Sequence, residues 1–343
     1  MSLGRCFAGH PMSHKLDMAQ KYGFAGVEVF YEDLLDMTSC DEPSAAAQLS
    51  AARSLRRMCE ARGLGVACLQ PFMHYGGEVD RRAHRRRVEE FRVFVAVARE
   101  LGTDLVVLPS SFLPAEQVTE DLGVIVEDLK EVADIAAAQT PVVKVAYEAL
   151  AWGTRVDTWE GSWEVVRRVG RDNFGICFDS FNLAGRIYAD PASATGRTGD
   201  DAEEAVAASV RRMLAEVDPA KVFAVQVADA ERLGEPLVKG HAFYDEEQPC
   251  RMSWSRNCRL LYGEGYLPCR EVLDAVVNGL GYEGWLSFEV FNRRLAERDG
   301  GVPEEMAARG ARSWARMVEE LSLKVEGRDG DGDAAQRDVQ ARL

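Results

Sequence analysis

The sequence lacks the features of a membrane, secreted or nucleic-acid-binding protein. No apolar run reaches the roughly 18 residues that a membrane span needs, and the opening stretch MSLGRCFAGHPMSHK has neither an apolar signal core nor a basic presequence. A formal net charge of −15 opposes long-range attraction to nucleic acid or to an anionic membrane. We therefore expect a cytoplasmic protein with neither partner, in which an anionic substrate needs locally placed cations.

The chain also lacks paired cysteines. None of its 8 cysteines forms a CxxC motif, and several stand inside apolar runs, as small hydrophobic residues do. This spacing predicts reduced thiols, in agreement with a cytoplasmic location.

What is present is a regular alternation of short apolar runs and longer amphipathic stretches. With 343 residues, of which 47% are hydrophobic, the chain can bury a sizeable core. The pattern predicts strands at 1–5, 26–30, 65–70, 104–109, 142–149, 174–179, 222–229 and 285–290. It predicts helices at 14–22, 45–62, 80–101, 119–139, 159–170, 202–217, 269–280 and 303–323. Strands and helices alternating in this way predict an α/β fold, a (β/α)8 TIM barrel.

Two segments interrupt this alternation. The connection 229–268 is far longer than an ordinary strand-to-helix loop, and we predict that it is an active-site loop. Residues 325–343 are polar and rich in Gly and Asp, which predicts a disordered tail. The barrel is therefore expected to be one domain, residues 1–324.

Oxygen-bearing side chains stand near the carboxyl ends of the later predicted strands: Glu148, Asp179, Gln226 and Glu289. In a barrel these ends converge on one mouth. Carboxylates brought together repel one another unless a positive charge lies among them, and hard oxygen ligands suit Mg²⁺ or Mn²⁺ better than Zn²⁺. We predict one divalent metal ion here, with Co²⁺ as a third candidate. The alternative is a polar network in the barrel interior without an ion.

The long connection carries cations and hydroxyls. Its arginines could bind the carboxylate of a small anionic substrate, and its hydroxyls could hydrogen-bond substrate oxygens or move protons. These residues are Arg251, Ser253, Ser255, Arg256, Arg259, Tyr262 and Tyr266. His241 precedes them, and His74 follows a predicted strand end, so each could also face the mouth. The alternative is a surface loop whose arginines pair with the acidic stretch YDEE, residues 244–247.

The motifs GVEVFYEDL, LQPF and WEVVRRV, with Glu, Asp, Gln and Glu on late strands, resemble those of xylose-isomerase-like sugar phosphate isomerase/epimerase barrels. The resemblance narrows to the 3-dehydroshikimate dehydratases of fungal quinate catabolism on the stretches MSLGR, YEALAWGTRVDTWE, FDSFNLAGRIYADP, MSWSRNCRLLYGEG and FNRR. It extends from residue 1 to about residue 320.

The resemblance implies a metal-dependent dehydration of 3-dehydroshikimate to protocatechuate and water. It implies that the metal ligands are Glu148, Asp179, Gln226 and Glu289, and that Ser255, Arg259 and Tyr266 contact the substrate, with Arg256 beside them.

The sequence departs from bacterial relatives at two places. Asn182 stands where they carry a histidine proposed to transfer a proton, and Met73 and His74 follow QPF where they carry an arginine. The proton-transfer group therefore stays open among Ser255, Tyr266, His74 and His241.

Other functions are weighed against this one. A sugar or sugar-acid isomerase or epimerase would use the same metal ligands, but the arginines of 251–259 favour an acidic substrate over a neutral sugar. A catalytically inactive ligand-binding barrel is a second alternative. An endonuclease with a multi-zinc cluster is disfavoured, because the chain has 5 histidines and none stands at a predicted strand end. Homo-oligomerisation is left open.

Overall fold

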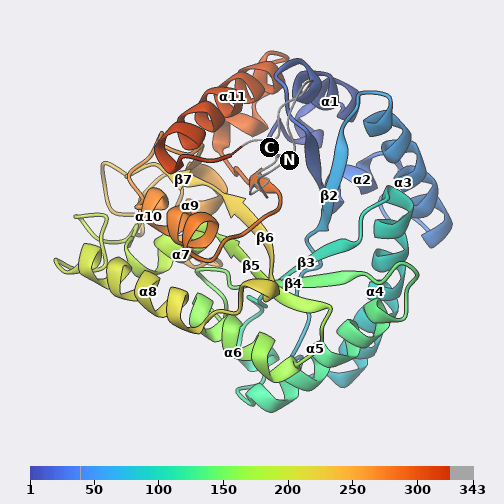
Figure 1. The fold of residues 1–343 in the computed structure, drawn as a ribbon, viewed down its shortest axis with the longest axis horizontal. Coiled ribbons are helices and arrows are strands. Elements are labelled where there is room, and N and C mark those ends of the chain that lie inside the picture. The colour runs from blue at the N-terminus through green and yellow to red at the C-terminus, as the bar shows by residue number, and fades with distance from the viewer. Residues whose placement is uncertain (39, 325–343) are drawn as a thin grey trace, which may run out of the picture.

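The computed structural model describes residues 1–38 and 40–324, and its centre is a parallel sheet rolled into a nearly closed barrel (Figure 1). Seven strands follow one another around it in chain order. They are β1 (Gly26–Phe30), β2 (Gly65–Gln70), β3 (Leu105–Pro109), β4 (Lys144–Glu148), β5 (Phe174–Asp179), β6 (Val222–Val227) and β9 (Leu286–Phe288). The predicted α/β barrel is confirmed, and all seven strands fall within predicted strand ranges.

The predicted first strand, residues 1–5, is wrong. This segment lies beside the end of β9, where the Ser2 hydroxyl donates to the Phe288 carbonyl (3.0 Å) and accepts from the Val290 N–H (2.9 Å). It makes a turn, with Gly4 at φ 111°. This positive φ lies outside the extended form that a strand needs, and a side chain at Gly4 would also meet the ring of His10 at 2.5 Å.

The helices form a ring outside the strands (Figure 1). Six of them connect successive barrel strands: α3 (Ala45–Glu60), α4 (Arg81–Leu101), α5 (Leu122–Ala137), α6 (Trp159–Val169), α8 (Ala202–Glu216) and α10 (Cys269–Asp274). In addition, α1 (Met12–Lys21) precedes β1 and α11 (Val302–Leu321) follows β9. Each overlaps a predicted helix. Helix α10 continues as a wider turn over Ala275–Gly279, and Gly102 ends α4 in the left-handed conformation expected of a helix C-cap.

Three further helices escaped the prediction because they directly follow strands or lie in the long connection. Helix α2 (Tyr31–Asp36) follows β1 without a loop, and α7 (Ser180–Ile187) follows β5 in the same way. Helix α9 (Cys250–Cys258) lies inside 229–268, between β7 (Asp229–Ala230) and β8 (Arg259–Leu260), which pair antiparallel. The long connection is therefore partly ordered by its own secondary structure.

The inside of the barrel is packed with small apolar side chains, which leaves room for polar groups at one end. Cys68, Val107, Ala146, Cys177 and Ala224 form one buried cluster from five neighbouring strands. None of the eight cysteines, all in the described part of the chain, forms a disulfide.

No helix within 1–38 and 40–324 combines the length and apolar character needed to cross a bilayer. The predicted tail, 325–343, falls outside the described residues, so the prediction of a single domain with a disordered tail stays a prediction.

Candidate active site

Three carboxylates come together at the mouth of the barrel. Glu148 is the last residue of β4, Asp179 is the last of β5, and Glu289 directly follows β9. One oxygen from each lies within 4.8 Å of the other two, and the three residues are only 4%, 3% and 6% exposed. Parallel strands that end at the same level deliver their last side chains to one place, which is why residues so distant in sequence meet here.

Asp179 serves both the helix that follows it and the cluster. Its Oδ1 accepts the N–H groups of Phe181 (2.6 Å) and Asn182 (3.1 Å), so it caps the amino end of α7. Its Oδ2 faces the other carboxylates and accepts from Asn182 and Arg259. A strand that ends in Asp can therefore pass directly into a helix and still present one oxygen to the mouth.

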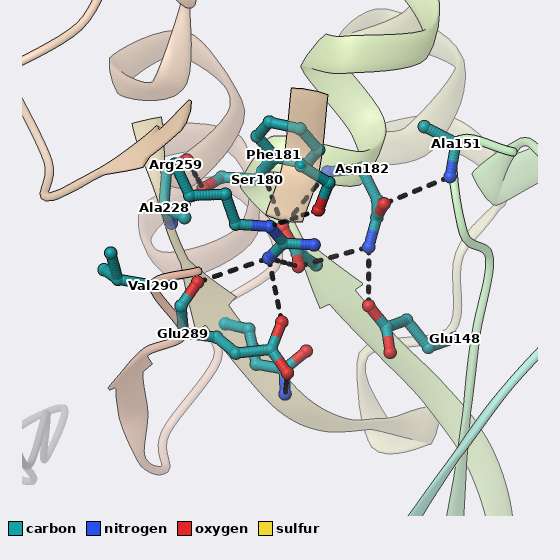
Figure 2. Close-up of polar contacts among 12 residues, drawn as sticks. Glu148, Ala151, Ser180, Phe181, Asn182, Ala228, Arg259, Glu289 and Val290 are labelled. Atoms are coloured by element: carbon teal, nitrogen blue, oxygen red, sulfur yellow. Dashed lines mark hydrogen bonds and ion pairs between the residues drawn. The ribbon is translucent and has the colours of Figure 1, made fainter. Parts of the chain in front are cut away.

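Arg259, the first residue of β8, brings a positive charge to two of the three carboxylates (Figure 2). Its Nη1 lies 2.6 Å from Oδ2 of Asp179 and 2.8 Å from Oε2 of Glu289, and its Nε donates to Oγ of Ser255 (2.9 Å). The guanidinium also lies 4.3 Å from the ring centre of Phe181 and 5.0 Å from that of Phe291. Its Nη2 makes no hydrogen bond to any described residue.

Asn182 links the third carboxylate to this group. Its Nδ2 donates to Oε1 of Glu148 (2.6 Å) and to Oδ2 of Asp179 (3.2 Å), while its Oδ1 accepts the N–H of Ala151 (3.1 Å) (Figure 2). Its amide therefore fixes the separation of two carboxylates. No cation in the described residues is hydrogen-bonded or ion-paired to Glu148.

Two glutamines and a fourth carboxylate lie next to Glu289. Nε2 of Gln226 is 3.3 Å from Oε1 of Glu289 and 3.2 Å from Oε2 of Glu28, while its Oε1 accepts from the Cys177 thiol (3.4 Å). Nε2 of Gln70 donates to the same two carboxylates, at 2.8 Å and 3.2 Å. The structure thus places Gln226 in contact with the cluster through its nitrogen.

Sequence analysis missed the contacts of Gln70. The available signal was its position as the last residue of β2, in LQPF, because the other strand-end oxygen carriers were recognised by the same criterion.

The cluster carries more negative than positive charge. Burial raises the pKa of Glu289 to about 8, where Arg259 opposes the shift and Asp179 and Glu28 add to it. Burial, with the charges of Glu289 and Asp179, also raises the pKa of Glu148 well above its usual range. A further cation near Glu148 would lower both pKa values and favour the ionised carboxylates.

The donor set fits a hard divalent ion. Three buried carboxylates that share one guanidinium have spare negative charge and oxygen ligands of the type that Mg²⁺ and Mn²⁺ prefer. The cluster could therefore hold a metal ion.

The other predicted site residues lie around this centre in different settings. Ser255 is buried and accepts from Arg259, as described above. Arg256 is exposed and donates to Oε1 of Gln248, with no ion pair to a described carboxylate. Tyr266 donates its hydroxyl to the carbonyl of Gly196 (2.7 Å), and burial raises its pKa.

Two predicted histidines differ in their surroundings. His74 has a left-handed backbone (φ 54°) and its ring lies 4.2 Å from that of Phe112. Burial and the charges of Arg87 and Arg256 lower its pKa to about 4, so the imidazole is neutral at pH 7. His241 accepts the Phe243 N–H through Nδ1 (3.1 Å), and the structure gives neither histidine a hydrogen bond to the carboxylates.

Known proteins are similar in sequence to this chain over most of its length. The pattern of the xylose isomerase-like TIM barrel family matches residues 16–317. The 3-dehydroshikimate dehydratase of Neurospora crassa is 55% identical over 339 residues, which are 95% of this chain and 94% of that protein. The 3-dehydroshikimate dehydratase of Pseudomonas aeruginosa is 32% identical over 82% of this chain but only 36% of its own length.

Solved structures agree on the fold. A xylose isomerase-like TIM barrel/4-hydroxyphenylpyruvate dioxygenase fusion protein superposes with a TM-score of 0.69 and 26% identity, over 93% of this chain and 42% of that one. The IOLI protein, described with a bound zinc atom, superposes with a TM-score of 0.63 and 20% identity, over 90% and 92% of the two chains. The chain therefore belongs to the xylose isomerase-like TIM barrel family.

Proposed function

We propose that this chain is an enzyme that dehydrates 3-dehydroshikimate to protocatechuate and water. The observation that carries the proposal is the 55% identity, over 95% of the chain, to the 3-dehydroshikimate dehydratase of Neurospora crassa. The cluster of carboxylates and arginine at the barrel mouth supports it, because the reaction needs both negative ligands for a metal and positive groups for an acidic substrate.

We assign the metal site to Glu148, Asp179, Gln226 and Glu289, with Mg²⁺ or Mn²⁺ as the first choice and Co²⁺ as the third. The all-oxygen donor set supports a hard ion. Gln226 would join the ligands through Oε1 after rotation of its amide, since its nitrogen now faces Glu289. A bound ion supplies Lewis acidity to a ketone oxygen that gains negative charge when a neighbouring C–H loses its proton.

The substrate carboxylate is assigned to the two arginines of α9 and β8. Arg256 has no acidic partner among the described residues, and Arg259 has Nη2 available while Nη1 binds Asp179 and Glu289. Positive groups at these positions would attract a small anion to a chain whose overall charge is negative.

For proton transfer we favour His74 among the four candidates. Its imidazole is unprotonated at pH 7, and its buried Nδ1 has no hydrogen-bond partner among the described residues, so this nitrogen is available to a substrate proton. The hydroxyl of Tyr266 is bound to Gly196, Ser255 is bound to Arg259, and His241 uses Nδ1 within its own loop. Asn182 cannot accept a proton at neutral pH, so its assigned role is to position Glu148 and Asp179.

A sugar isomerase or epimerase is the second candidate. Inosose isomerases of Bacillus licheniformis and Bacillus subtilis are 33% and 31% identical, each over only 30% of this chain. The neighbouring arginines favour the acidic substrate over a neutral polyol. We place the enzyme in the cytoplasm, which the unpaired cysteines support.

The test is incubation of purified protein with 3-dehydroshikimate while the ultraviolet absorbance of a catechol acid is followed. We expect product formation that stops with a chelator and returns with Mg²⁺ or Mn²⁺. Restoration of activity by Zn²⁺ alone would replace the assignment of Mg²⁺ or Mn²⁺ by Zn²⁺. Turnover of inosose in place of 3-dehydroshikimate would favour the isomerase. Absence of any bound divalent ion and of any metal-dependent rise in melting temperature would favour the inactive barrel.

A further inference from the structure

We propose that the positive charge of Arg259 limits the affinity of the carboxylate cluster for its metal ion, so that a neutral residue at this position binds the metal more tightly. The inference rests on the proposed function only in taking Glu148, Asp179 and Glu289 as metal ligands. It assigns Arg259 an effect on the metal in addition to its proposed contact with the substrate.

The guanidinium uses the same oxygens that a metal ion would use. Nη1 of Arg259 lies 2.6 Å from Oδ2 of Asp179. It also lies 2.8 Å from Oε2 of Glu289 and donates to the backbone carbonyl of Glu289 at 3.2 Å, and Figure 2 shows both contacts to Glu289. An ion bound to these oxygens would therefore lie within a few ångströms of a like charge.

Arg259 is held firmly in this place. The residue is 1% exposed, Nε is bound to Ser255, and the rings of Phe181 and Phe291 lie near the guanidinium. Because these contacts come from α9, from α7 and from the segment after β9, the side chain cannot reach solvent without breaking them. Its charge must stay close to the ion.

Arg259 also has an effect of opposite sign. It orients two ligand carboxylates, and the loss of such an orienting contact typically weakens metal affinity about 10–100-fold. Repulsion between a single and a double positive charge about 4 Å apart, at an effective dielectric constant of about 20, corresponds to roughly 10⁶-fold in affinity as an upper limit. Repulsion is the larger effect, and we expect a net gain of at least about tenfold when the charge is removed.

The arrangement gives the mouth more positive charge than the metal alone would supply. Since Nη2 of Arg259 has no partner in the described chain, the same side chain can face an anionic substrate while Nη1 opposes the metal. Loss of Arg259 should therefore separate two properties: the metal binds more tightly and the substrate more weakly.

The experiment titrates metal-depleted protein with Mn²⁺ and measures free Mn²⁺ by electron paramagnetic resonance. We compare wild type, Arg259→Gln, Arg259→Lys and Arg256→Gln, the last being a matched arginine without a carboxylate partner. Arg259→Gln is expected to lower the Kd for Mn²⁺ at least about tenfold, Arg259→Lys to change it less than about threefold, and Arg256→Gln to leave it unchanged. An unchanged or higher Kd in folded Arg259→Gln overturns the inference.

Two additions make the result unambiguous. Arg259→Met is a second neutral variant. Of Arg259→Gln and Arg259→Met, the variant that keeps the wild-type circular dichroism spectrum is the one whose Kd for Mn²⁺ decides the outcome. Glu148→Gln tests the ligand assignment itself: if this variant binds Mn²⁺ as wild type does, the proposed metal site fails. If it loses Mn²⁺ while the neutral Arg259 variant shows no tighter binding, only the inference about Arg259 fails.

Discussion

Two buried ion-pair clusters in the described part of the chain differ in their charge balance. Between α1 and α2, Nζ of Lys15 lies 2.8 Å from Oδ1 of Asp33, and the Met1 ammonium lies 2.6 Å from Oδ2. At the barrel mouth, the guanidinium of Arg259 pairs with Asp179 and Glu289, while Glu148 has no ion-paired cation among the described residues. In the first cluster two cations pair with the single carboxylate of Asp33. In the second cluster one cation lies among three carboxylates.

The pKa directions reflect this difference. Burial by itself would raise the pKa of Asp33, but the Met1 ammonium and Lys15 lower it to about 2. Burial raises that of Glu289 to about 8 although Arg259 lies against it. Removing one partner of a paired buried cluster destabilises the fold because a charge is left unpaired, whereas an acidic cluster is costly unless a ligand brings positive charge. Burial and ion pairing alone do not distinguish a structural cluster from a functional one; the charge balance does.

Glu289→Gln should give the largest effect and should affect activity rather than folding. It removes one negative ligand and one partner of Arg259. We expect kcat/KM to fall by more than about 10³-fold, with loss of bound metal, because an interaction that stabilises developing charge is removed. Product absorbance and metal content after gel filtration measure this. Wild-type kinetics in this variant would show that the mouth cluster is not the metal site.

Asp33→Asn should affect folding rather than activity. Lys15, only 3% exposed, would lose its buried partner, which typically costs about 3–5 kcal/mol in the free energy of unfolding. We expect the urea midpoint to fall, while kcat of the folded protein stays near wild type. The matched control is Arg53→Ala, which breaks an exposed pair with Glu100 and should cost less than about 1 kcal/mol. A large loss of kcat in folded Asp33→Asn would contradict the contrast between the clusters.

The loss of folding stability at acid pH should also depend on the first cluster, through Asp33. The folded pKa of Asp33 is below its reference value of 3.8, so its stabilisation is present above about pH 4 and is lost as pH falls toward 2. The shift corresponds to about 2 kcal/mol. Urea unfolding of wild type and Asp33→Asn across this range measures it. The gap between the two proteins should narrow as pH falls, and a constant gap would contradict the lowered pKa.

The strand pattern predicted the barrel because each strand is a short, largely apolar run and amphipathic helices alternate with these runs along the chain. The period of apolar residues could not reveal α2 and α7, since each begins at the residue after a strand, where no loop residues separate the two patterns. The turn at residues 1–5 was also hidden, because MSLGR has an apolar character compatible with an edge strand, and its contacts to Phe288 and Val290 lie almost 290 residues away.

The candidate site was predicted to the extent that it depends on strand ends. Glu148, Asp179 and Glu289 could be grouped because parallel strands bring their carboxyl ends together. The direction of a long side chain could not be predicted: Arg259 was expected to face the substrate, and the structure directs its Nη1 to two carboxylates. Such a choice depends on three-dimensional charge balance, which sequence spacing does not contain.

Asn182→Ala should give the smallest of these effects and separates positioning from catalysis. It leaves Oε1 of Glu148 without its amide donor and the Ala151 N–H without its acceptor. We expect metal affinity to fall about 10–100-fold, as for other residues that orient metal ligands, with a stability loss of about 1–3 kcal/mol. Metal titration and kinetics at saturating Mn²⁺ measure the two effects, and activity should largely return once the metal is saturating. If activity stays lost although the metal Kd is unchanged, Asn182 acts on the substrate. The contrast between a cluster proposed to bind metal and one that stabilises the fold would then need a third, directly catalytic component.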